Sequence, residues 1–326
     1  MHKLAILDDY QHVAHNFADW SSLEHRGVAV TVFDQHLATE AEVVDALRDT
    51  DIIIAMRERT PFPGRILEKL PQLKLLVTTG AANASIDVEA ASRLGITVCG
   101  TGGSPTAAPE LTWALLLAFA RNLTQEEAAL RDGRWQTGVG FELSGKTLGI
   151  VGLGKIGTRM AGYGRAFGME VLAWSQNLTE EAAAAAGARK VGKDELFRES
   201  DVVSLHLRLS PRTEGTVGER ELRLLGPDGV LVNTARGPLV DQRALVTALH
   251  EGWIRGAALD VFDQEPLPSG HPLLSAPRTL LAPHLGYVTD ASYRAFFGGA
   301  LEDVAAWLDG SPIRTLTPTP TPTPTP

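Results

Sequence analysis

The 326-residue sequence predicts an α/β protein built from two open parallel sheets. Short apolar runs typical of buried strands alternate with helix-like patterns in both halves of the chain. Such alternation is typical of parallel sheets whose two faces are covered by helices. The length fits about two domains. One apolar run in the second half also continues into a glycine-rich turn and a helix pattern. This combination distinguishes the second predicted sheet from the first.

The first hundred residues contain five apolar runs that we expect to form one sheet. They cover residues 3–7, 28–33, 51–55, 73–77 and 96–99. Helical patterns separate them at 13–23, 40–47, 65–70 and 87–94.

The second sheet is expected between residues 102 and 284, after a long helix pattern at 108–132. Its runs cover residues 147–151, 169–174, 201–205, 230–233, 257–261 and 279–281. Another helix pattern follows at 291–308.

The glycine-rich turn predicts a dinucleotide site. Gly152, Gly154 and Gly157 have the spacing G-x-G-x-x-G and stand between a strand-like run and a helix-like segment. In this motif the first glycine permits a tight turn, the second lets the backbone approach a pyrophosphate, and the third allows close helix packing. The helix N-terminus then offers N–H groups and a positive dipole end to the anion.

Composition excludes several other classes of function. The formal net charge of −9 disfavours nucleic acid and anionic lipid as partners. No run reaches the roughly 18 apolar residues of a membrane span, and the acidic N-terminus does not resemble a signal peptide, so we expect a cytoplasmic protein. The single cysteine, Cys99, excludes an intramolecular disulfide and a multi-cysteine metal site, and we expect no metal.

The sequence ends in alternating Thr-Pro. Proline cannot support helix hydrogen bonds, so we expect residues 315–326 to be extended and disordered, without a function in the site.

Four stretches, in this order, resemble the D-isomer-specific 2-hydroxyacid dehydrogenases. They read LSGKTLGIVGLGKIG at 143–157, LVNTARGPLVDQRAL at 231–245, AALDVFDQEPLP at 257–268 and LAPHLG at 281–286. The resemblance implies a Rossmann NAD(P)-binding domain, 102–284, inserted into a flavodoxin-like substrate domain, 1–101 with 285–314. It also implies an active site between the two domains.

Three positions match the catalytic residues of that family: Arg236, Glu265 and His284. By resemblance, His284 is the acid/base, Glu265 orients it, and Arg236 binds the substrate carboxylate and carbonyl. The residue types suit the reduction of a 2-oxo acid. An imidazole can donate or accept a proton near neutral pH, and a guanidinium offers permanently charged donors to a carboxylate.

Further residues are expected around these three. By resemblance, the backbone N–H groups of Ala81, Ala82 and Asn83 would meet the substrate carboxylate. Arg57, at a strand end, either faces the site or is exposed to solvent. The glycine motif and the resemblance together imply the cofactor-binding residues Thr106, Gly152, Gly154, Lys155, Ile156, Gly157, Ser175, His206, Thr213, Thr234, Ala235, Arg236, Asp260, His284 and Gly286.

The choice between NAD and NADP stays open at this point. The strand after the fingerprint helix normally ends in an acidic residue that binds the adenosine ribose, but here Ser175 stands at that position. Loss of the carboxylate removes its repulsion of a 2′-phosphate, yet no arginine follows immediately to bind that phosphate.

The expected activity is that of an NAD(P)-dependent 2-hydroxyacid dehydrogenase acting on glyoxylate, hydroxypyruvate or a similar small acid. The resemblance implies a homodimer that forms through the nucleotide domain, with a contribution from the helix after Pro105. Two alternatives remain: a phosphoglycerate dehydrogenase, and a dinucleotide-sensing, co-repressor-like binding protein. The family's formate branch has a glutamine where Glu265 stands, so this chain departs from it.

Overall fold

The computed structural model describes residues 1–318, and the chain divides into two compact units. Unit 1 is Met1–Ser104 together with the chain from Thr289 onward, and unit 2 is Pro105–Val288. Unit 1 is therefore discontinuous in sequence. No helix in the described part of the chain is both long enough and apolar enough to span a membrane.

Unit 1 contains a five-stranded, all-parallel sheet with the order β2-β1-β3-β4-β5. This is the flavodoxin-like strand order. Its strands are β1 (His2–Ile6), β2 (Val28–Val32), β3 (Ile52–Ala55), β4 (Leu75–Thr78) and β5 (Thr97–Gly100).

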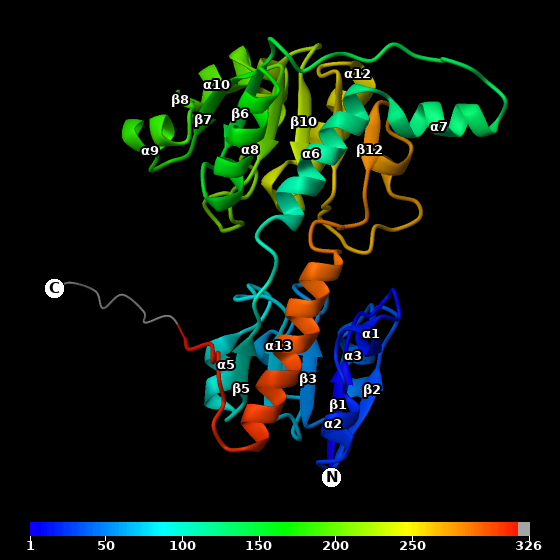
Figure 1. Cartoon of the computed structure of the whole chain (residues 1–326), viewed down its shortest axis with the longest axis vertical. Helices are drawn as coiled ribbons and strands as arrows, with labels where there is room; N and C mark the ends of the chain where they lie inside the picture. The colour runs from blue at the N-terminus through cyan, green and yellow to red at the C-terminus, as the bar shows by residue number, and fades with distance from the viewer. Residues whose placement is uncertain (319–326) are drawn as a thin grey trace. The chain divides into compact units, whose positions relative to one another are not determined.

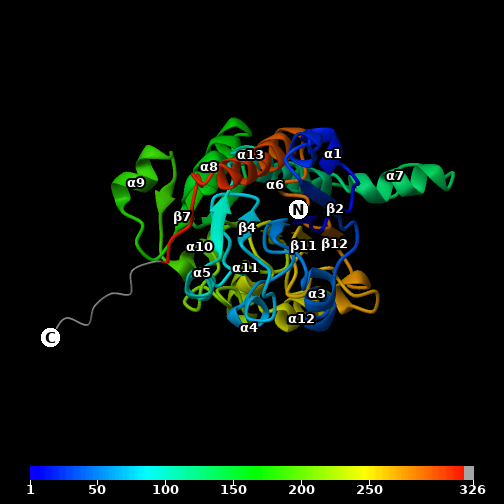
Figure 2. The same cartoon turned by 90° about the horizontal axis from the view of Figure 1, so that it is seen from below.

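Helices cover both faces of this sheet, as the end-on view shows (Figure 2). On one face, α3 (Glu40–Leu47), α4 (Gly64–Leu67) and α5 (Val88–Arg93) pack against alternate strand residues in one apolar core. The other face carries α1 (Ala14–Phe17), α2 (Ser21–Glu24) and α13 (Asp290–Leu308), of which α13 contacts β4 and β5. Two-sided burial explains why the strands read as continuous apolar runs.

Unit 2 contains a seven-stranded parallel sheet with the order β12-β11-β10-β9-β6-β7-β8 (Figure 1). Six of these strands, β8-β7-β6-β9-β10-β11, reproduce the doubly wound order 3-2-1-4-5-6. In this order the direction in which successive strands are added to the sheet reverses next to the first strand, here β6. The strands are β6 (Thr147–Val151), β7 (Glu170–Trp174), β8 (Arg189–Lys190), β9 (Val202–Leu205), β10 (Val230–Asn233), β11 (Gly256–Leu259) and β12 (Thr279–Leu281).

Two apolar cores lie on the two faces of this second sheet. One joins the sheet to α10 (Lys193–Glu199), α11 (Glu219–Leu225) and α12 (Gln242–Glu251). The other joins it to α6 (Ala107–Ala120) and α8 (Lys155–Ala166). The remaining helices of the unit are α7 (Leu123–Arg131), α9 (Glu180–Ala185) and the short 3-10 turns η1 (Gly237–Leu239) and η2 (Pro272–Leu274).

Two of the expected helices are divided in the structure. The pattern at 108–132 forms α6 and α7, because Asn122 adopts a left-handed conformation with φ of 52° and interrupts the helix. Asparagine tolerates this conformation better than most residues. The pattern at 13–23 forms α1 and α2, which are separated by an extended Ala18. The two-residue strand β8 was not expected, because two residues carry no periodicity.

The expected disorder from residue 315 is wrong at its start. Thr315 pairs with Cys99 of β5 in an antiparallel bridge, and Leu316 N–H donates to the Val98 carbonyl at 2.8 Å. The side chain of Leu316 packs against the core of unit 1. We call residues 313–316 the C-terminal strap. Residues 319–326 of the expected tail lie outside the described residues.

Candidate active site

The glycine turn joins β6 to α8, and each glycine meets a different constraint. Gly152 has φ of 101°, and a Cβ there would lie 2.8 Å from the backbone of His206. A Cβ at Gly157 would lie 2.2 Å from the carbonyl oxygen of Gly152, so the helix packs directly on the turn. A Cβ at Gly154 would meet no atom within 4 Å. Among the three glycines of the motif, Gly154 alone leaves open space, and this is the position where a pyrophosphate would approach the backbone.

The N-terminus of α8 fits an anionic group. Gly154 is the N-cap and provides no side-chain cap. Within residues 1–318, the N–H groups of Lys155 and Ile156 donate no hydrogen bond to the chain. Orphan N–H groups at the positive end of a 12-residue helix would hold the pyrophosphate of a dinucleotide.

Substitution of Gly154 and Gly157 by alanine should separate binding from folding. Gly154→Ala adds a methyl group only to open space, so its melting temperature should stay within about 1 °C while the nucleotide dissociation constant rises at least tenfold. Gly157→Ala forces the helix away from fixed backbone and should lower the melting temperature by several degrees. Calorimetry of unfolding and fluorescence titration with NADH measure both effects. Equal effects of the two substitutions on stability would contradict this interpretation.

The other expected cofactor residues lie in the same unit, mostly at the carboxyl ends of its strands. Ser175 follows β7, and His206 follows β9 with its Nε2 at 2.8 Å from Ser204 Oγ. Burial lowers the pKa of His206 to about 3, so its imidazole is neutral at physiological pH. The Thr213 hydroxyl donates to the Arg208 carbonyl at 2.7 Å and thereby closes the loop after β9. Thr106 precedes the first turn of α6.

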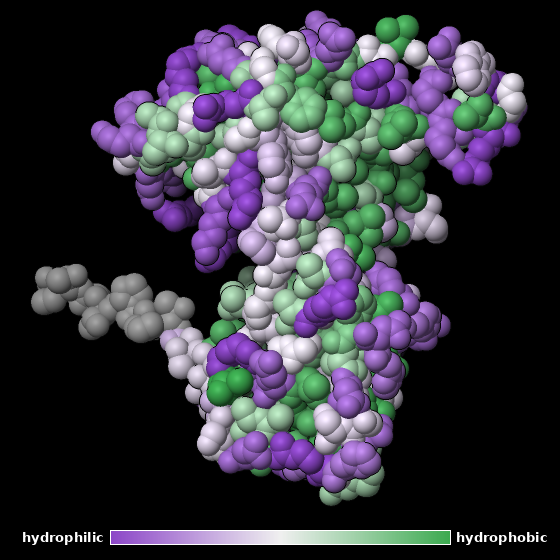
Figure 3. Space-filling model, viewed as in Figure 1, coloured by the Kyte–Doolittle hydropathy of each residue, from purple (hydrophilic) through white to green (hydrophobic). Residues whose placement is uncertain are grey.

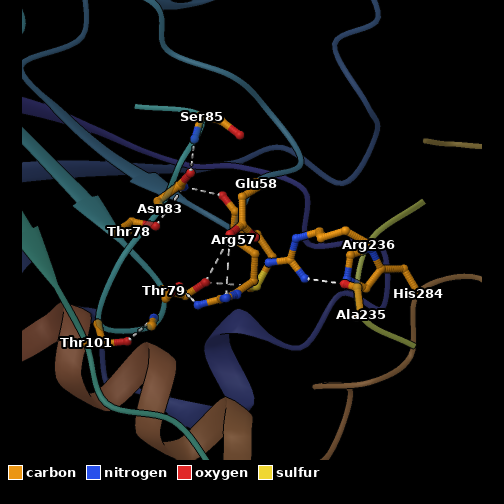
Figure 4. A network of polar contacts seen from close by, with 12 residues as sticks. Arg57, Glu58, Thr78, Thr79, Asn83, Ser85, Thr101, Ala235, Arg236 and His284 are labelled. Carbon is orange, nitrogen blue, oxygen red and sulfur yellow. Dashed lines mark hydrogen bonds and ion pairs between the residues drawn. The ribbon is translucent and has the colours of Figure 1, made fainter. Parts of the chain in front are cut away.

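Asn233, at the end of β10, organises the loop that carries Arg236. Its Oδ1 accepts from the N–H of Ala235 at 3.0 Å, and its Nδ2 donates to the Arg236 carbonyl at 2.9 Å. The neighbouring Thr234 hydroxyl lies 2.6 Å from that of the buried Thr112 in α6. Arg236 is partly buried, and its Nη1 donates to the Ala235 carbonyl at 2.6 Å (Figure 4).

Glu265 and His284 form a hydrogen-bonded pair. His284 Nδ1 lies 2.5 Å from Glu265 Oε2, and the two side chains are 14% and 22% exposed. The other carboxylate oxygen of Glu265 accepts from the N–H of Phe262 at 2.9 Å, which fixes the glutamate on its own loop. The ring of Tyr287 stands edge-on to the imidazole, with centroids 5.5 Å apart. A carboxylate on Nδ1 fixes the tautomer and the orientation of the ring.

Asp260, at the end of β11, positions the backbone next to His284. Its Oδ1 accepts from the N–H of Leu285 at 2.6 Å and its Oδ2 from that of Gly286 at 2.9 Å. The side chain is completely buried, and this burial raises the pKa of Asp260 to about 6, although the N–H donors of Leu285 and Gly286 oppose the increase. His284 itself has φ of 54°, so the loop places the imidazole from a left-handed backbone that few residues adopt.

Gly237 brings the arginine loop against the glutamate loop. A Cβ at this position would lie 2.1 Å from the backbone carbonyl carbon of Phe262, the residue whose N–H binds Glu265. Sequence reasoning did not select Gly237 or Asn233 as site residues. The glycine directly after Arg236 was the only signal in the sequence for this close approach.

In unit 1, the expected substrate residues lie at the carboxyl ends of β3 and β4 (Figure 4). Arg57 has φ of 53°, and its N–H and Nη1 both donate to Thr79, at 2.9 and 3.0 Å. Asn83 is buried, and its Nδ2 donates to the Arg57 carbonyl at 2.6 Å and to Thr78 Oγ1 at 2.9 Å. These contacts connect the loop after β3 with the loop after β4. The Arg57 side chain is 23% exposed. This value lies between a side chain that faces the site and one that is fully exposed to solvent, the two alternatives left open by the sequence.

The turn after β4 leaves three consecutive donors unused. Ala81 and Ala82 are exposed, and within residues 1–318 the N–H groups of Ala81, Ala82 and Asn83 donate to no other group of the chain. The Asn83 side chain holds the turn because its Oδ1 accepts from the N–H of Ser85 at 2.8 Å. Consecutive N–H groups in a turn form a concave site that favours anions.

The comparisons with known proteins agree with the motifs in sequence and in fold. Residues 113–286 match the model of the D-isomer specific 2-hydroxyacid dehydrogenase, NAD binding domain. The chain belongs to this family. A glyoxylate reductase of Aeropyrum pernix is 42% identical over 75% of this chain and 76% of its own length. A D-3-phosphoglycerate dehydrogenase of Methanocaldococcus jannaschii is 38% identical over 79% of this chain, but the match spans only 49% of that relative.

Several solved structures share the fold over nearly the whole chain. A phosphoglycerate oxidoreductase of Vibrio cholerae is 41% identical with a TM-score of 0.90, covering 95% of this chain and 100% of that one. A D-lactate dehydrogenase of Aquifex aeolicus, complexed with NAD and lactic acid, is 26% identical with a TM-score of 0.78 over 94% and 96% of the two chains. An acyclic imino acid reductase in complex with NADPH and D-Arg is 27% identical with a TM-score of 0.75 over 96% and 99%.

These findings confirm the family and the two-sheet α/β fold that the sequence predicted. The chain is an NAD(P)-dependent D-2-hydroxyacid dehydrogenase, that is, an oxidoreductase acting on a CH–OH group. The likeness to both an NAD complex and an NADPH complex leaves the preference between the two cofactors open.

Proposed function

We propose that this dehydrogenase reduces a small 2-oxo acid, such as glyoxylate or hydroxypyruvate, to the D-2-hydroxy acid. The observation that carries the proposal is the pair formed by His284 Nδ1 and Glu265 Oε2 at 2.5 Å. The pair stands in the same unit as Arg236 and the glycine turn. A nicotinamide cofactor bound at this turn supplies the hydride for the reduction.

His284 is the proposed proton donor to the carbonyl oxygen of the substrate. Its Nδ1 is held by Glu265, so Nε2 is the atom that delivers the proton, and it removes the proton in the reverse direction. Glu265 fixes the orientation of the ring by its hydrogen bond. Asp260 keeps the backbone of Leu285 and Gly286 in place and thereby positions the imidazole.

Arg236 is proposed to bind the carboxylate and the carbonyl oxygen of the substrate. Its backbone is fixed by Asn233, and Gly237 holds its loop against the loop of Glu265. A permanently charged, planar guanidinium suits a planar carboxylate. In unit 1, we propose that the unused N–H groups of Ala81, Ala82 and Asn83 bind an oxygen of the substrate. Arg57 is proposed to shape that turn through Thr79 and Asn83.

For the cofactor, we propose that Lys155 and Ile156 bind the pyrophosphate by their N–H groups. Ser175, His206 and Thr213 are proposed on the adenosine side. Thr106, Thr234, Ala235, Asp260 and Gly286 are proposed on the nicotinamide side, with Arg236 and His284 next to the reacting atoms. The neutral end of β7 at Ser175 supports no preference between NAD and NADP.

A panel of 2-oxo acids, assayed with NADH and with NADPH, tests the proposed function. We expect turnover with glyoxylate or hydroxypyruvate, and a difference in kcat/KM of at least tenfold between the two cofactors would assign the preference. 3-Phosphohydroxypyruvate belongs in the panel because phosphoglycerate oxidoreductases are among the similar proteins. Tight NADH binding without turnover on any acid would instead favour the dinucleotide-sensing alternative.

We further propose that the protein acts in the cytoplasm as a homodimer, in which α7 and the segment after it contact a second copy. Four of the large apolar side chains that are exposed lie between residues 123 and 139. They are Leu123, Leu130, Trp135 and Val139, which are 61%, 56%, 76% and 91% exposed. Figure 3 shows apolar residues among hydrophilic ones in this region of unit 2. Exposed apolar side chains clustered in one segment are typical of protein contacts.

The double substitution Trp135→Glu with Val139→Glu should convert a dimer into a monomer, because the new charges would be buried without partners. Light scattering after size-exclusion chromatography should give a mass near 34.9 kDa for the variant and twice that for the wild type. Leu274→Glu, at an exposed leucine elsewhere in unit 2, is the matched control and should stay dimeric. A monomeric wild type would refute the proposal.

A further inference from the structure

The hydroxyl group of Thr101, directly after β5, holds the first residue of the turn 80–83 in unit 1. Its Oγ1 accepts from the N–H of Gly80 at 2.8 Å and donates to the Gly102 carbonyl at 3.0 Å (Figure 4). Thr101 is 1% exposed, so no solvent competes for this hydroxyl. The N–H groups of residues 81–83, which follow Gly80, are the ones that donate to no other group of residues 1–318. The hydroxyl therefore binds one N–H group of the turn and leaves the next three for a ligand.

The backbone around Thr101 is packed directly against the same turn. The N–H of Thr101 donates to the Thr78 carbonyl at 3.1 Å, which continues the pairing of β4 with β5 to the end of both strands. A Cβ at Gly100 would lie 2.8 Å from the carbonyl oxygen of Gly80. Glycine at position 100 therefore allows the end of β5 to contact the turn closely enough for the hydrogen bond from Gly80 to Thr101.

Helix α13 fixes the Thr101 side chain from the other side. A Cβ at the buried Gly299 of this helix would lie 3.0 Å from the Cβ of Thr101 and 3.3 Å from its Cγ2. The C-terminal strap adds to this contact, because Arg314 Nη2 donates to the Gly299 carbonyl at 2.8 Å. The Arg314 carbonyl accepts from the N–H of Gly100 at 3.1 Å. Thr101 is thus held between α13 and the turn, with little freedom to rotate.

We infer that Thr101 is a positioning residue for the reduction, because it fixes the N–H groups that bind the substrate. This role rests on the proposed function, in which residues 81–83 bind an oxygen of the 2-oxo acid. Asn83 fixes the other end of the turn through Ser85 and Thr78, at 2.8 and 2.9 Å. A turn that is held at both ends needs no ordering when the substrate binds, which lowers the entropic cost of binding.

Steady-state kinetics of the full chain with the preferred 2-oxo acid and reduced cofactor test this role. Thr101→Val removes the hydroxyl at nearly unchanged size, so the KM for the acid should rise about tenfold or more. The kcat and the KM for the cofactor should stay within about threefold of the wild type, because the lost contact acts equally on bound substrate and transition state. Thr101→Ser keeps the hydroxyl and should restore the KM for the acid.

Thr50→Val is the matched control for Thr101→Val. Thr50 is also a buried threonine of unit 1, but it precedes β3 and so lies at the opposite edge of the parallel sheet. The same loss of a hydroxyl there should leave both KM values and kcat at the wild-type level.

A second pair of variants changes the position of Thr101 without removing its hydroxyl. Gly299→Ala adds a methyl group that meets the Thr101 side chain and should raise the KM for the acid. Gly298→Ala adds a methyl group that meets no atom within 4 Å, so it should leave this KM unchanged. Both variants replace glycine by a better helix former in α13, so a weaker helix cannot explain a difference between them.

The outcomes separate the role of Thr101 from the proposed function. If the KM for the acid were unchanged in Thr101→Val, or in Gly299→Ala where Thr101→Val does not fold, Thr101 would not be a positioning residue and the proposed function would stand. A wild type that turned over none of the 2-oxo acids would refute the proposed function and the role of Thr101 together.

Discussion

Replacement of His284 by alanine is expected to lower kcat by a factor of about 10² to 10⁴, the usual contribution of a positioned acid/base. The variant keeps the glycine turn and Arg236, so NADH binding should change by less than about threefold. The reason is the proposed role of Nε2 as the proton donor, since Nδ1 is held by Glu265 at 2.5 Å. Stopped-flow measurement of NADH oxidation with the preferred 2-oxo acid gives kcat, and fluorescence titration gives the cofactor affinity.

Two further variants sharpen this test. His250→Ala removes an exposed histidine of α12 in the same unit and should retain wild-type turnover. Glu265→Gln keeps a hydrogen-bond acceptor for Nδ1, so the ring stays oriented and kcat should fall less than in His284→Ala. If His284→Ala turned over within threefold of the wild type at neutral pH, the acid/base assignment would be wrong.

The second large effect concerns stability rather than catalysis, and it is centred on Arg314 in the C-terminal strap. Its Nε donates to Asp303 Oδ1 at 2.9 Å, its Nη1 to Glu302 Oε2 at 2.9 Å, and its Nη2 to the Gly299 carbonyl at 2.8 Å. The Asp303 side chain has no exposed surface, and its Oδ2 lacks a hydrogen-bond partner within the described residues. Arg314→Ala would leave this carboxylate buried and unpaired.

Breaking a buried pair in this way costs about 3–5 kcal/mol in general. The Arg314 side chain is 35% exposed, so solvent screening reduces the expected loss to about 2–3 kcal/mol at pH 8. Chemical denaturation measures the free energy of unfolding. Arg294→Ala breaks an exposed i, i+4 pair with Asp290 on the same helix and, as the matched control, should cost about 0.5 kcal/mol or less.

The destabilisation caused by Arg314→Ala should also increase with pH. Burial raises the pKa of Asp303 from 3.8 to about 6, against the opposing effect of Arg314. The folded state therefore holds the proton more tightly than the unfolded state, so this carboxyl's contribution to stability decreases as the pH rises from about 4 to 6. Without Arg314 the folded pKa would rise further. The destabilisation by Arg314→Ala should thus be small at pH 5 and larger at pH 8, and the reverse order would contradict the argument.

Much of the fold was predictable because its signals are local. The run from β6 through the glycine turn to β7 was predicted within one residue, since buried strands and phosphate-binding turns carry strong sequence patterns. The break at Asn122 was missed, because the helix periodicity continues across a single left-handed residue. Pairing of the C-terminal strap with β5 was also missed, because it joins residues far apart in the chain and has no periodic signal of its own.

The residues of the candidate site were also predictable only in part. Motifs identified Arg236, Glu265 and His284, and the structure places Glu265 in direct contact with His284. The groups that fix these side chains were not predictable in their roles. Asp260 acts on the backbone N–H groups of Leu285 and Gly286, and Gly237 is required by the proximity of Phe262. Both are properties of loops that meet only in three dimensions.

The discontinuous nature of unit 1 has a consequence for synthesis on the ribosome. Helix α13 packs on β4 and β5, yet it is translated only after all of residues 105–288. At typical elongation rates this interval lasts roughly 10–40 s. During that time one apolar face of the first sheet lacks its longest helix, and a nascent chain in this state exposes hydrophobic surface that chaperones recognise. Because the chain is synthesised from the N-terminus, unit 2 is the first of the two units whose residues have all been translated.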